Sequence, residues 1–184
     1  RLRAILGRDR AFRWFVVLRI LSQVAIMATA FYIVYAAQEL GLGAGRAGLL
    51  TGVFAGAQMV GNPLLGWAGD RFGRRAVLAF GMACAGASAL VAWAAPSLGW
   101  FYLVYVLAGL AYVATWTVPL AMLLEFGDAS DRPAYIGLGN TLFAPSVVLA
   151  PLAGGWLAQT AGFPATFLAS VVGAVAAIVV LVAF

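Results

Sequence analysis

Histidine and lysine are absent from this 184-residue chain, cysteine occurs once, and charged residues make up only 9% of it. Soluble domains carry about 25% charged residues, so this composition excludes an ordinary soluble domain. The single Cys84 cannot form an intramolecular disulfide. Without histidine, a zinc or iron site has too few of its usual ligands. We therefore expect no metal site and no cofactor.

Carboxylates are also scarce, and none lies in the middle of an apolar run. No serine or cysteine has a recognisable base beside it, and no pair of carboxylates is placed to act as acid and base within an apolar segment. We therefore expect that the chain is not an enzyme. A carboxylate that could relay protons inside a membrane is missing for the same reason.

What remains is a hydrophobic sequence, with 65% apolar residues and a mean hydropathy of +1.02. A helix needs roughly 20 apolar residues to cross a bilayer. Six runs are that long, at 14–38, 47–68, 76–95, 100–124, 134–158 and 165–184. They are continuous rather than alternating, which argues against β-barrel strands. The sequence predicts an all-α membrane protein with six transmembrane helices.

The arginines are distributed unevenly between the two sets of connections. All of them except Arg46 lie near the N-terminus, after the second run or after the fourth run. Basic residues gather in cytoplasmic loops, so we expect a multi-pass protein of the cell membrane with both termini cytoplasmic and the 39–46 loop external. Attraction to anionic lipid explains a pI near 10, so membrane lipid, and no nucleic acid, is the expected partner.

An internal repeat divides the chain into two units. In QELGLGAGRAG (38–48) and LEFGDASDRPA (124–134), a glutamate, a glycine and an arginine recur in the same order and spacing. This pattern predicts a basic connector at 1–13, a first three-helix repeat at 14–95 and a second at 96–184. Because three is an odd number of crossings, the second repeat would be inverted relative to the first. Chance agreement in a glycine-rich sequence is the alternative.

A polar stretch, GWAGDRFGRR (66–75), separates the second and third runs. Its glycines Gly66 and Gly73 permit close backbone approach and a tight turn. Asp70, among three arginines at a helix boundary, can form a partly desolvated ion pair. The stretch lacks the GxxxxGK[ST] pattern of a phosphate loop. The alternative is that its arginines only fix the topology.

This stretch resembles the signature loop of the major facilitator superfamily, G-x-x-x-D-R-x-G-R-R, which lies between helices 2 and 3 of a six-helix half. The resemblance implies that Asp70 contacts a helix end of the opposite half and stabilises the state closed to the cytoplasm. It also implies an acidic and a basic residue farther along that extend this network. The candidate gating residues are therefore Gly66, Asp70, Arg71, Gly73, Arg74, Arg75, Glu125 and Arg132.

The same resemblance implies a secondary transporter that moves a small solute by alternating access. Family members normally have two six-helix halves, and this chain corresponds to one, with an opening similar to the start of a second half. The expected partners are a small-molecule solute and a second six-helix half, in the same chain or in a second copy. The alternative is a six-helix membrane scaffold or channel subunit without transport activity.

In such bundles the first helix of each repeat lines most of the central cavity. The polar residues on these helices and on the second helix are the substrate-pathway candidates. They are Gln23, Tyr32, Tyr35, Gln58, Thr115, Trp116 and Thr117. Hydrogen bonding between helices, or an aromatic belt at the interface, is the alternative for each. Arg19 is expected to extend into the headgroups instead of lining the pathway.

Overall fold

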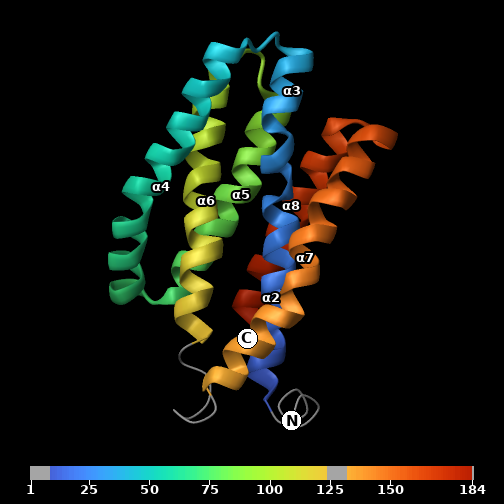
Figure 1. Ribbon diagram of the computed structural model, residues 1–184. Helices are drawn as coiled ribbons and strands as arrows, with labels where there is room; N and C mark the ends of the chain where they lie inside the picture. The colour runs from blue at the N-terminus through green and yellow to red at the C-terminus, as the bar shows by residue number, and fades with distance from the viewer. Residues whose placement is uncertain (1–8, 124–131, 184) are drawn as a thin grey trace.

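The computed structural model describes residues 9–123 and 132–183, and all regular structure in these ranges is helical. The long helices lie side by side in an elongated bundle (Figure 1). In chain order the elements are α2 (Arg10–Ile26), η1 (Met27–Phe31), α3 (Tyr32–Glu39), α4 (Ala44–Phe72), α5 (Arg74–Ala94), α6 (Trp100–Leu123), α7 (Arg132–Ala161) and α8 (Phe163–Ala183). The predicted α-helical class is confirmed.

The first apolar run forms one rod from three consecutive segments, α2, η1 and α3. Asp9 starts it, because its Oδ1 accepts a hydrogen bond from the Phe12 amide at 2.9 Å, as an N-terminal cap does. The helix therefore begins at Arg10, inside the segment expected to be a connector. Near its middle the rod changes to the 3₁₀ helix η1, where the Ala28 amide donates to Ser170 Oγ of α8 at 3.1 Å.

Gly73 alone connects α4 to α5. Its φ of +90° is one that residues with a side chain rarely adopt, and its amide donates to the Gly69 carbonyl at 3.0 Å to close the end of α4. Most of the 66–75 stretch is consequently helical, with the last turns of α4 before Gly73 and the first turn of α5 after it. The expected tight turn is confirmed.

Small residues bring the helices into close contact. Helix α6 packs against α4 and α5, and α8 packs against α2, α5 and α7. A Cβ placed on Gly81 of α5 would lie only 2.2 Å from the Cβ of Ala114 on α6. On Gly109 of α6 it would lie 2.9 Å from the Phe54 carbonyl oxygen of α4. These contacts leave no space for a side chain at either glycine.

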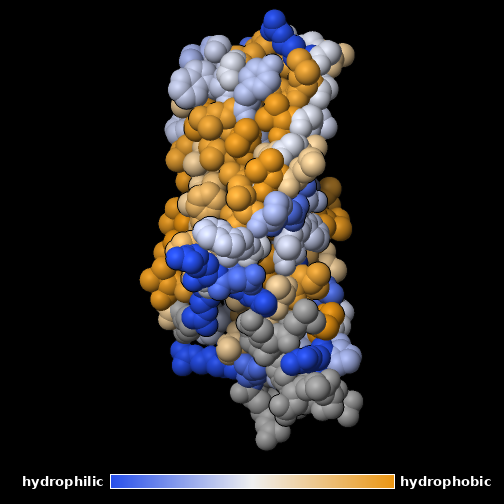
Figure 2. Space-filling model, turned by 90° about the vertical axis from the view of Figure 1, so that its left-hand side faces the viewer, coloured by the Kyte–Doolittle hydropathy of each residue, from blue (hydrophilic) through white to orange (hydrophobic). Residues whose placement is uncertain are grey.

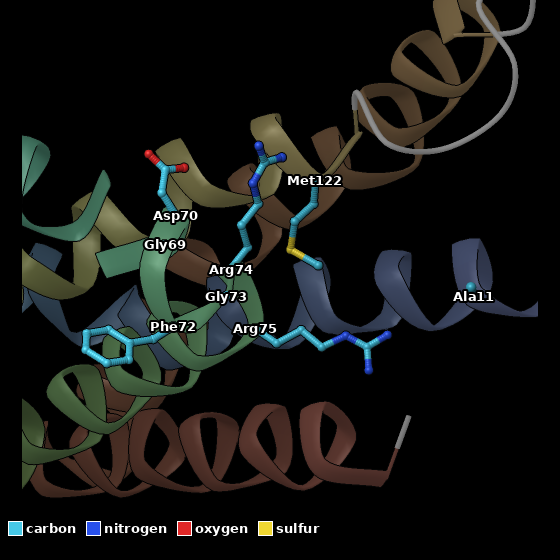
Figure 3. Close-up of a pocket in the computed structure, with 8 residues that line it drawn as sticks. All are labelled: Ala11, Gly69, Asp70, Phe72, Gly73, Arg74, Arg75 and Met122. Atoms are coloured by element: carbon cyan, nitrogen blue, oxygen red, sulfur yellow. The ribbon is translucent and has the colours of Figure 1, made fainter. Parts of the chain in front are cut away.

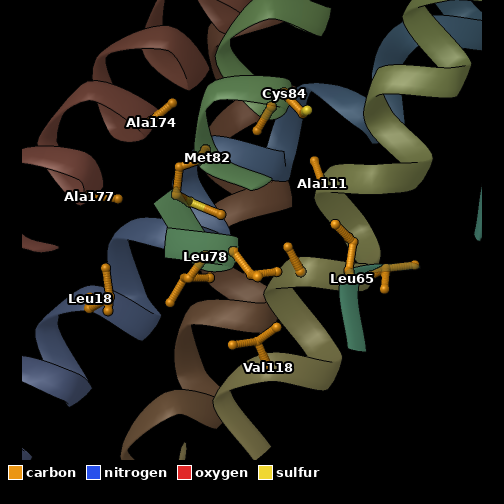
Figure 4. Packing of buried hydrophobic residues seen from close by; sticks show 14 residues of the cluster. Leu18, Leu65, Leu78, Met82, Cys84, Ala111, Val118, Ala174 and Ala177 are labelled. Atoms are coloured by element: carbon orange, nitrogen blue, oxygen red, sulfur yellow. The ribbon is translucent and has the colours of Figure 1, made fainter. Parts of the chain in front are cut away.

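The largest buried cluster lies where α2, α4, α5, α6 and α8 meet (Figure 4). Its labelled members are leucine, methionine, valine and alanine side chains together with Cys84. Cys84 is buried and belongs to this packing, as expected from its position in an apolar run.

Five helical segments are long and apolar enough to cross a membrane: Arg10–Glu39, Arg74–Ala94, Trp100–Leu123, Arg132–Ala161 and Phe163–Ala183. The sixth predicted span, now α4, is not among them, so the expectation of six is met only in part. Helix α4 has 29 residues and packs against α6, but its many glycines, with Gln58 and Asn62, lower its hydropathy.

The ends of the bundle differ in charge. One end, the arginine end, carries Arg10, Arg13, Arg71, Arg74, Arg75 and Arg132, whereas Arg46 lies at the opposite end (Figure 1). Figure 2 views the side of the bundle on which α4 lies, and shows an apolar surface above hydrophilic residues that gather toward the arginine end. This charge pattern agrees with the one read from the sequence.

Candidate functional site

The turn between α4 and α5 lies beside a cavity of about 750 Å³ at the arginine end (Figure 3). Asp70, Arg74 and Arg75 line it, together with Ala11 of α2 and Met122 of α6. In Figure 3 the Asp70 and Arg74 side chains extend to the same side of the turn, whereas Arg75 points along α2. The cavity therefore lies between the charged turn and the helices α2 and α6.

Arg74 links this turn to α6. Its side chain is half-buried, and Nη1 donates a hydrogen bond to the Ala121 carbonyl near Leu123, the last residue of α6 that the structure describes. Carbonyls in the last turn of a helix lack helical donors and carry partial negative charge, so a guanidinium there is stabilising. The contact joins the first predicted repeat to the second, which the sequence did not reveal.

The other residues of the charged turn are more exposed than expected. Asp70 and Arg71 are both exposed, so the predicted desolvation of an Asp70 ion pair is not observed. The Arg71 guanidinium carbon lies 5.9 Å from the ring centroids of both Trp67 and Phe72. A Cβ on Gly66 would meet no atom within 4 Å, so the close approach expected there is not found among the described residues.

Two further gating candidates lie in or next to the connection between α6 and α7. Glu125 is outside the described residues. Arg132 is the first residue of α7 and is exposed at the arginine end. The acidic and basic network that the sequence predicts around Asp70 therefore stays a prediction.

A second cavity, the central cavity, has a volume of about 390 Å³ and is lined by α2, η1, α4, α6 and α7. Three of the predicted pathway residues meet there, namely Gln23, Gln58 and Trp116. Phe54 and Tyr112 also line it and were not predicted. The spacing of Tyr112 and Trp116, four residues apart on one helix, was the sequence signal that could have found Tyr112.

Tyr32 and Tyr35 share a helix face as predicted, but that face is directed into the bundle. Tyr32 is 1% exposed, and its hydroxyl lies 2.8 Å from Ser88 Oγ of α5. The rings of Tyr32 and Tyr35 lie 5.6 and 5.2 Å, respectively, from the ring of Phe167 on α8. Neither tyrosine lines the central cavity. In the described chain they are packing residues.

The two predicted threonines of α6 also lie outside the central cavity. Thr115 is fully buried, and its Oγ1 donates to the Ala111 carbonyl of its own helix at 2.7 Å. Thr117 is exposed, donates to Asn62 Oδ1 of α4 at 3.3 Å and lines a separate cavity of about 140 Å³ between α4 and α6. Its hydrogen bond connects two helices, which was the alternative for this residue.

Arg19 does not extend into the headgroups, so this expectation is wrong. It is 6% exposed, and Nη1 donates to the Thr115 carbonyl of α6. Its guanidinium carbon lies 3.8 Å from the ring centroid of Phe143 on α7. Pro119 has no N–H to bond the carbonyl four residues earlier, so Arg19 supplies the donor that Thr115 lacks. The helix starts at Arg10, earlier than its apolar run, so Arg19 lies in the interior of α2 and packs against α6 and α7.

Comparisons with known proteins show the family of this chain. The family profile of the Major Facilitator Superfamily matches residues 15–184. The chain is 34% identical over 125 residues to the tetracycline resistance protein, class C, of Escherichia coli, and the match covers 68% of the chain and 31% of that protein. For the class B protein of Escherichia coli, identity is 28% over 134 residues, covering 73% and 33%.

A human protein, solute carrier family 67 member A1, is 32% identical over 149 residues, which cover 77% of this chain and 35% of the human protein. The chain thus spans about a third of the length of the curated relatives that it matches. The family profile covers nearly the whole chain, and the helices are apolar enough for a multi-pass membrane protein. This chain belongs to the major facilitator superfamily.

Proposed function

We propose that this chain is one half of a secondary transporter that moves a small solute by alternating access. The observation that carries the proposal is the central cavity, which collects polar and aromatic side chains from helices of both predicted repeats. Sites of this kind lie at repeat interfaces near the membrane midplane. Two relatives are named for resistance to tetracycline, an effect that outward transport would produce, so export is the favoured direction.

The helix packing supports six spans arranged as two inverted repeats. Exchanging the α2–α3 rod with α6, α4 with α7, and α5 with α8 would relate the two repeats. The contact of α5 with α6 then corresponds to that of α8 with α2, and the contact of α4 with α6 corresponds to that of α7 with α2 and η1. The contact of α4 with α5 likewise corresponds to that of α7 with α8, which supports two repeats of related packing.

We place the arginine end in the cytoplasm, because arginine is concentrated there. In a Cys84→Ala background, cysteines introduced at the exposed positions Arg46 and Arg71 should label differently with a membrane-impermeant maleimide. Position 46 is expected to react in intact cells, and position 71 only after permeabilisation. The protein that keeps Cys84, which is buried among α5 and its neighbours, and has neither introduced cysteine serves as the unreactive control. Labelling of position 71 in intact cells would show that the arginine end is external, opposite to the proposed orientation.

A second six-helix half is the proposed partner, in the same chain or a second copy. Large apolar side chains are exposed on α4, including Met59 and Trp67, and on α7, including Leu152 and Trp156. Lipid or a second half can cover these faces. Two halves that rock against each other around the central cavity would open it alternately to each side. Neither an enzyme activity nor a cofactor forms part of this proposal.

The charged turn is the proposed gate at the cytoplasmic end. Arg74 already ties α5 to the end of α6, and exposed Asp70 beside it is free to contact a helix end of the other half. Asp70→Asn should therefore weaken the state closed to the cytoplasm and lower transport by about tenfold, which corresponds to about 1.4 kcal/mol. The yield of folded protein should stay nearly unchanged, because the side chain is exposed.

Counterflow in proteoliposomes tests both the function and the gate. The complete protein, as its gene encodes it, is reconstituted and assayed for exchange of labelled against unlabelled tetracycline and other small solutes. Glu39→Gln is the matched control, because it removes an exposed carboxylate at the opposite end of the bundle. Folded protein without counterflow of any solute would favour the scaffold alternative. Equal loss in both variants would refute the gating role.

A further inference from the structure

Gln23 has an unusual position in the central cavity. Its side chain is 5% exposed, and Nε2 has no hydrogen-bond partner among the residues that the structure describes. A buried amide donor normally finds an acceptor, because leaving it unpaired costs free energy in a medium of low dielectric constant. Gln23 lines the cavity, but Nε2 itself is buried, so its amide must turn toward the cavity before a solute inside can supply the missing acceptor.

An acceptor on another wall lacks its usual donor. Pro151 of α7 has no N–H, so it cannot bond the carbonyl of Val147 four residues earlier, and both residues line the central cavity. At Pro119 the carbonyl freed in the same way is bonded by Arg19. The residues that line the cavity therefore include one with an unpaired side-chain donor and one with a carbonyl that lacks its helical partner.

Three aromatic rings also line the central cavity. The centroid of Phe54 on α4 lies 5.7 Å from that of Tyr112, which lies 5.8 Å from that of Trp116. Phe54 meets Tyr112 edge-on, at 69°, and Tyr112 is tilted by 35° from Trp116, so the three rings offer both faces and an edge to an aromatic ligand. A volume of about 390 Å³ falls within the range of small-molecule sites, about 300–1,000 Å³.

None of the described residues that line the central cavity is charged. A charged side chain contacts one of the lining rings from outside the cavity. The guanidinium carbon of Arg19 lies 5.8 Å from the ring centroid of Trp116. Its charge disfavours a cationic solute. Because Arg19 is already bonded to the Thr115 carbonyl, it is a helix-bridging residue and not a ready anion site. These features favour an uncharged ligand.

We propose that the central cavity binds an uncharged aromatic solute that carries a carbonyl acceptor next to an N–H or O–H donor, with Gln23 Nε2 donating to the carbonyl. Phe54, Tyr112 and Trp116 stack against its ring, and the Val147 carbonyl accepts from its donor. The assignment rests on the proposed function, since the cavity is the proposed transport pathway. It adds the chemical class of the solute and names Gln23 as the residue that selects it.

Equilibrium dialysis of the complete protein in detergent tests the assignment with labelled 2-naphthamide as the probe. Saturable binding is expected, with competition by unlabelled 2-naphthamide but not by 2-naphthylmethylammonium, which is a cation, or by naphthalene, which has no acceptor. Loss of one neutral hydrogen bond in Gln23→Met should weaken binding about three- to tenfold. Gln38→Met is the matched control, because Gln38 is exposed at the far end of the same rod.

Folding of the variants is followed by size-exclusion chromatography. Gln23→Met should fold normally, since it removes a buried donor without a partner. Trp116→Leu is a second test. Loss of this ring should also weaken binding, and the variant should fold because Trp116 is 37% exposed. Equal affinity in wild type and both variants, or equal competition by all three compounds, would overturn the assignment.

Counterflow separates this assignment from the proposed function. Selective binding that depends on Gln23, without counterflow of 2-naphthamide, tetracycline or any other solute tested, would support the ligand class and contradict transport. Counterflow of tetracycline without selective binding of 2-naphthamide would support transport and contradict the ligand class.

Discussion

Gly81→Ala is expected to destabilise the bundle by about 1–3 kcal/mol, because the added methyl group overlaps α6. Its Cβ would lie 2.2 Å from the Cβ of Ala114 and 3.6 Å from its Cα, so the two helices must separate along their contact. The free energy of unfolding in mixed detergent micelles, measured by titration with dodecyl sulfate, gives the change directly. Such a loss is a large part of the stability of a typical domain.

Two matched controls distinguish helix packing from the general effect of replacing glycine. Gly56 on α4 and Gly137 on α7 are exposed, and a Cβ on either meets no described atom within 4 Å. Their alanine variants should be neutral or more stable, since alanine favours a helix over glycine by about 0.8–1.0 kcal/mol. If Gly81→Ala were as stable as these controls, α5 and α6 would not be packed as closely as described.

Arg19→Met is expected to leave the Thr115 carbonyl buried without a donor, a penalty of about 1–3 kcal/mol. Pro119→Ala should remove that penalty, because alanine restores the backbone N–H that Thr115 lacks. The double variant is therefore expected to be more stable than Arg19→Met alone. The coupling between the two substitutions should be about 1–3 kcal/mol in a double-mutant cycle, measured by the same unfolding titration.

The cycle has an internal control in another helix proline. Pro63 on α4 is exposed and frees the carbonyl of Met59, which Arg19 does not contact. Pro63→Ala combined with Arg19→Met should show additive changes, within about 0.5 kcal/mol. Additivity for Pro119→Ala as well would mean that Arg19 is not held in place by the carbonyl that proline frees.

Local properties of the sequence determined several features of this protein. The helical class follows from long continuous apolar runs, because a chain in lipid must satisfy its own backbone hydrogen bonds. The turn at Gly73 follows from a residue without a side chain between two helices. Burial of Cys84 follows from its place in an apolar run. Each of these depends on a residue and its near neighbours.

Only the tertiary structure decided which side chains meet. The sequence predicted Gln23, Gln58 and Trp116 as pathway residues, and the structure brings these three together. Tyr32, predicted with them, points into the core instead. Successive residues of a helix point about 100° apart, so the face that a residue occupies depends on how its helix is rotated in the bundle. The 3₁₀ segment η1 changes that rotation within the first rod.

The same reason explains Arg19. Its partner is a carbonyl on α6 that a proline frees, far away in the chain. A charge near the start of an apolar run looks like a headgroup contact as long as the neighbouring helices are unknown. The carbonyl that needs a donor exists only where α2 and α6 pack side by side, so the packing of these helices, and not the pattern of either one, determined the role of Arg19.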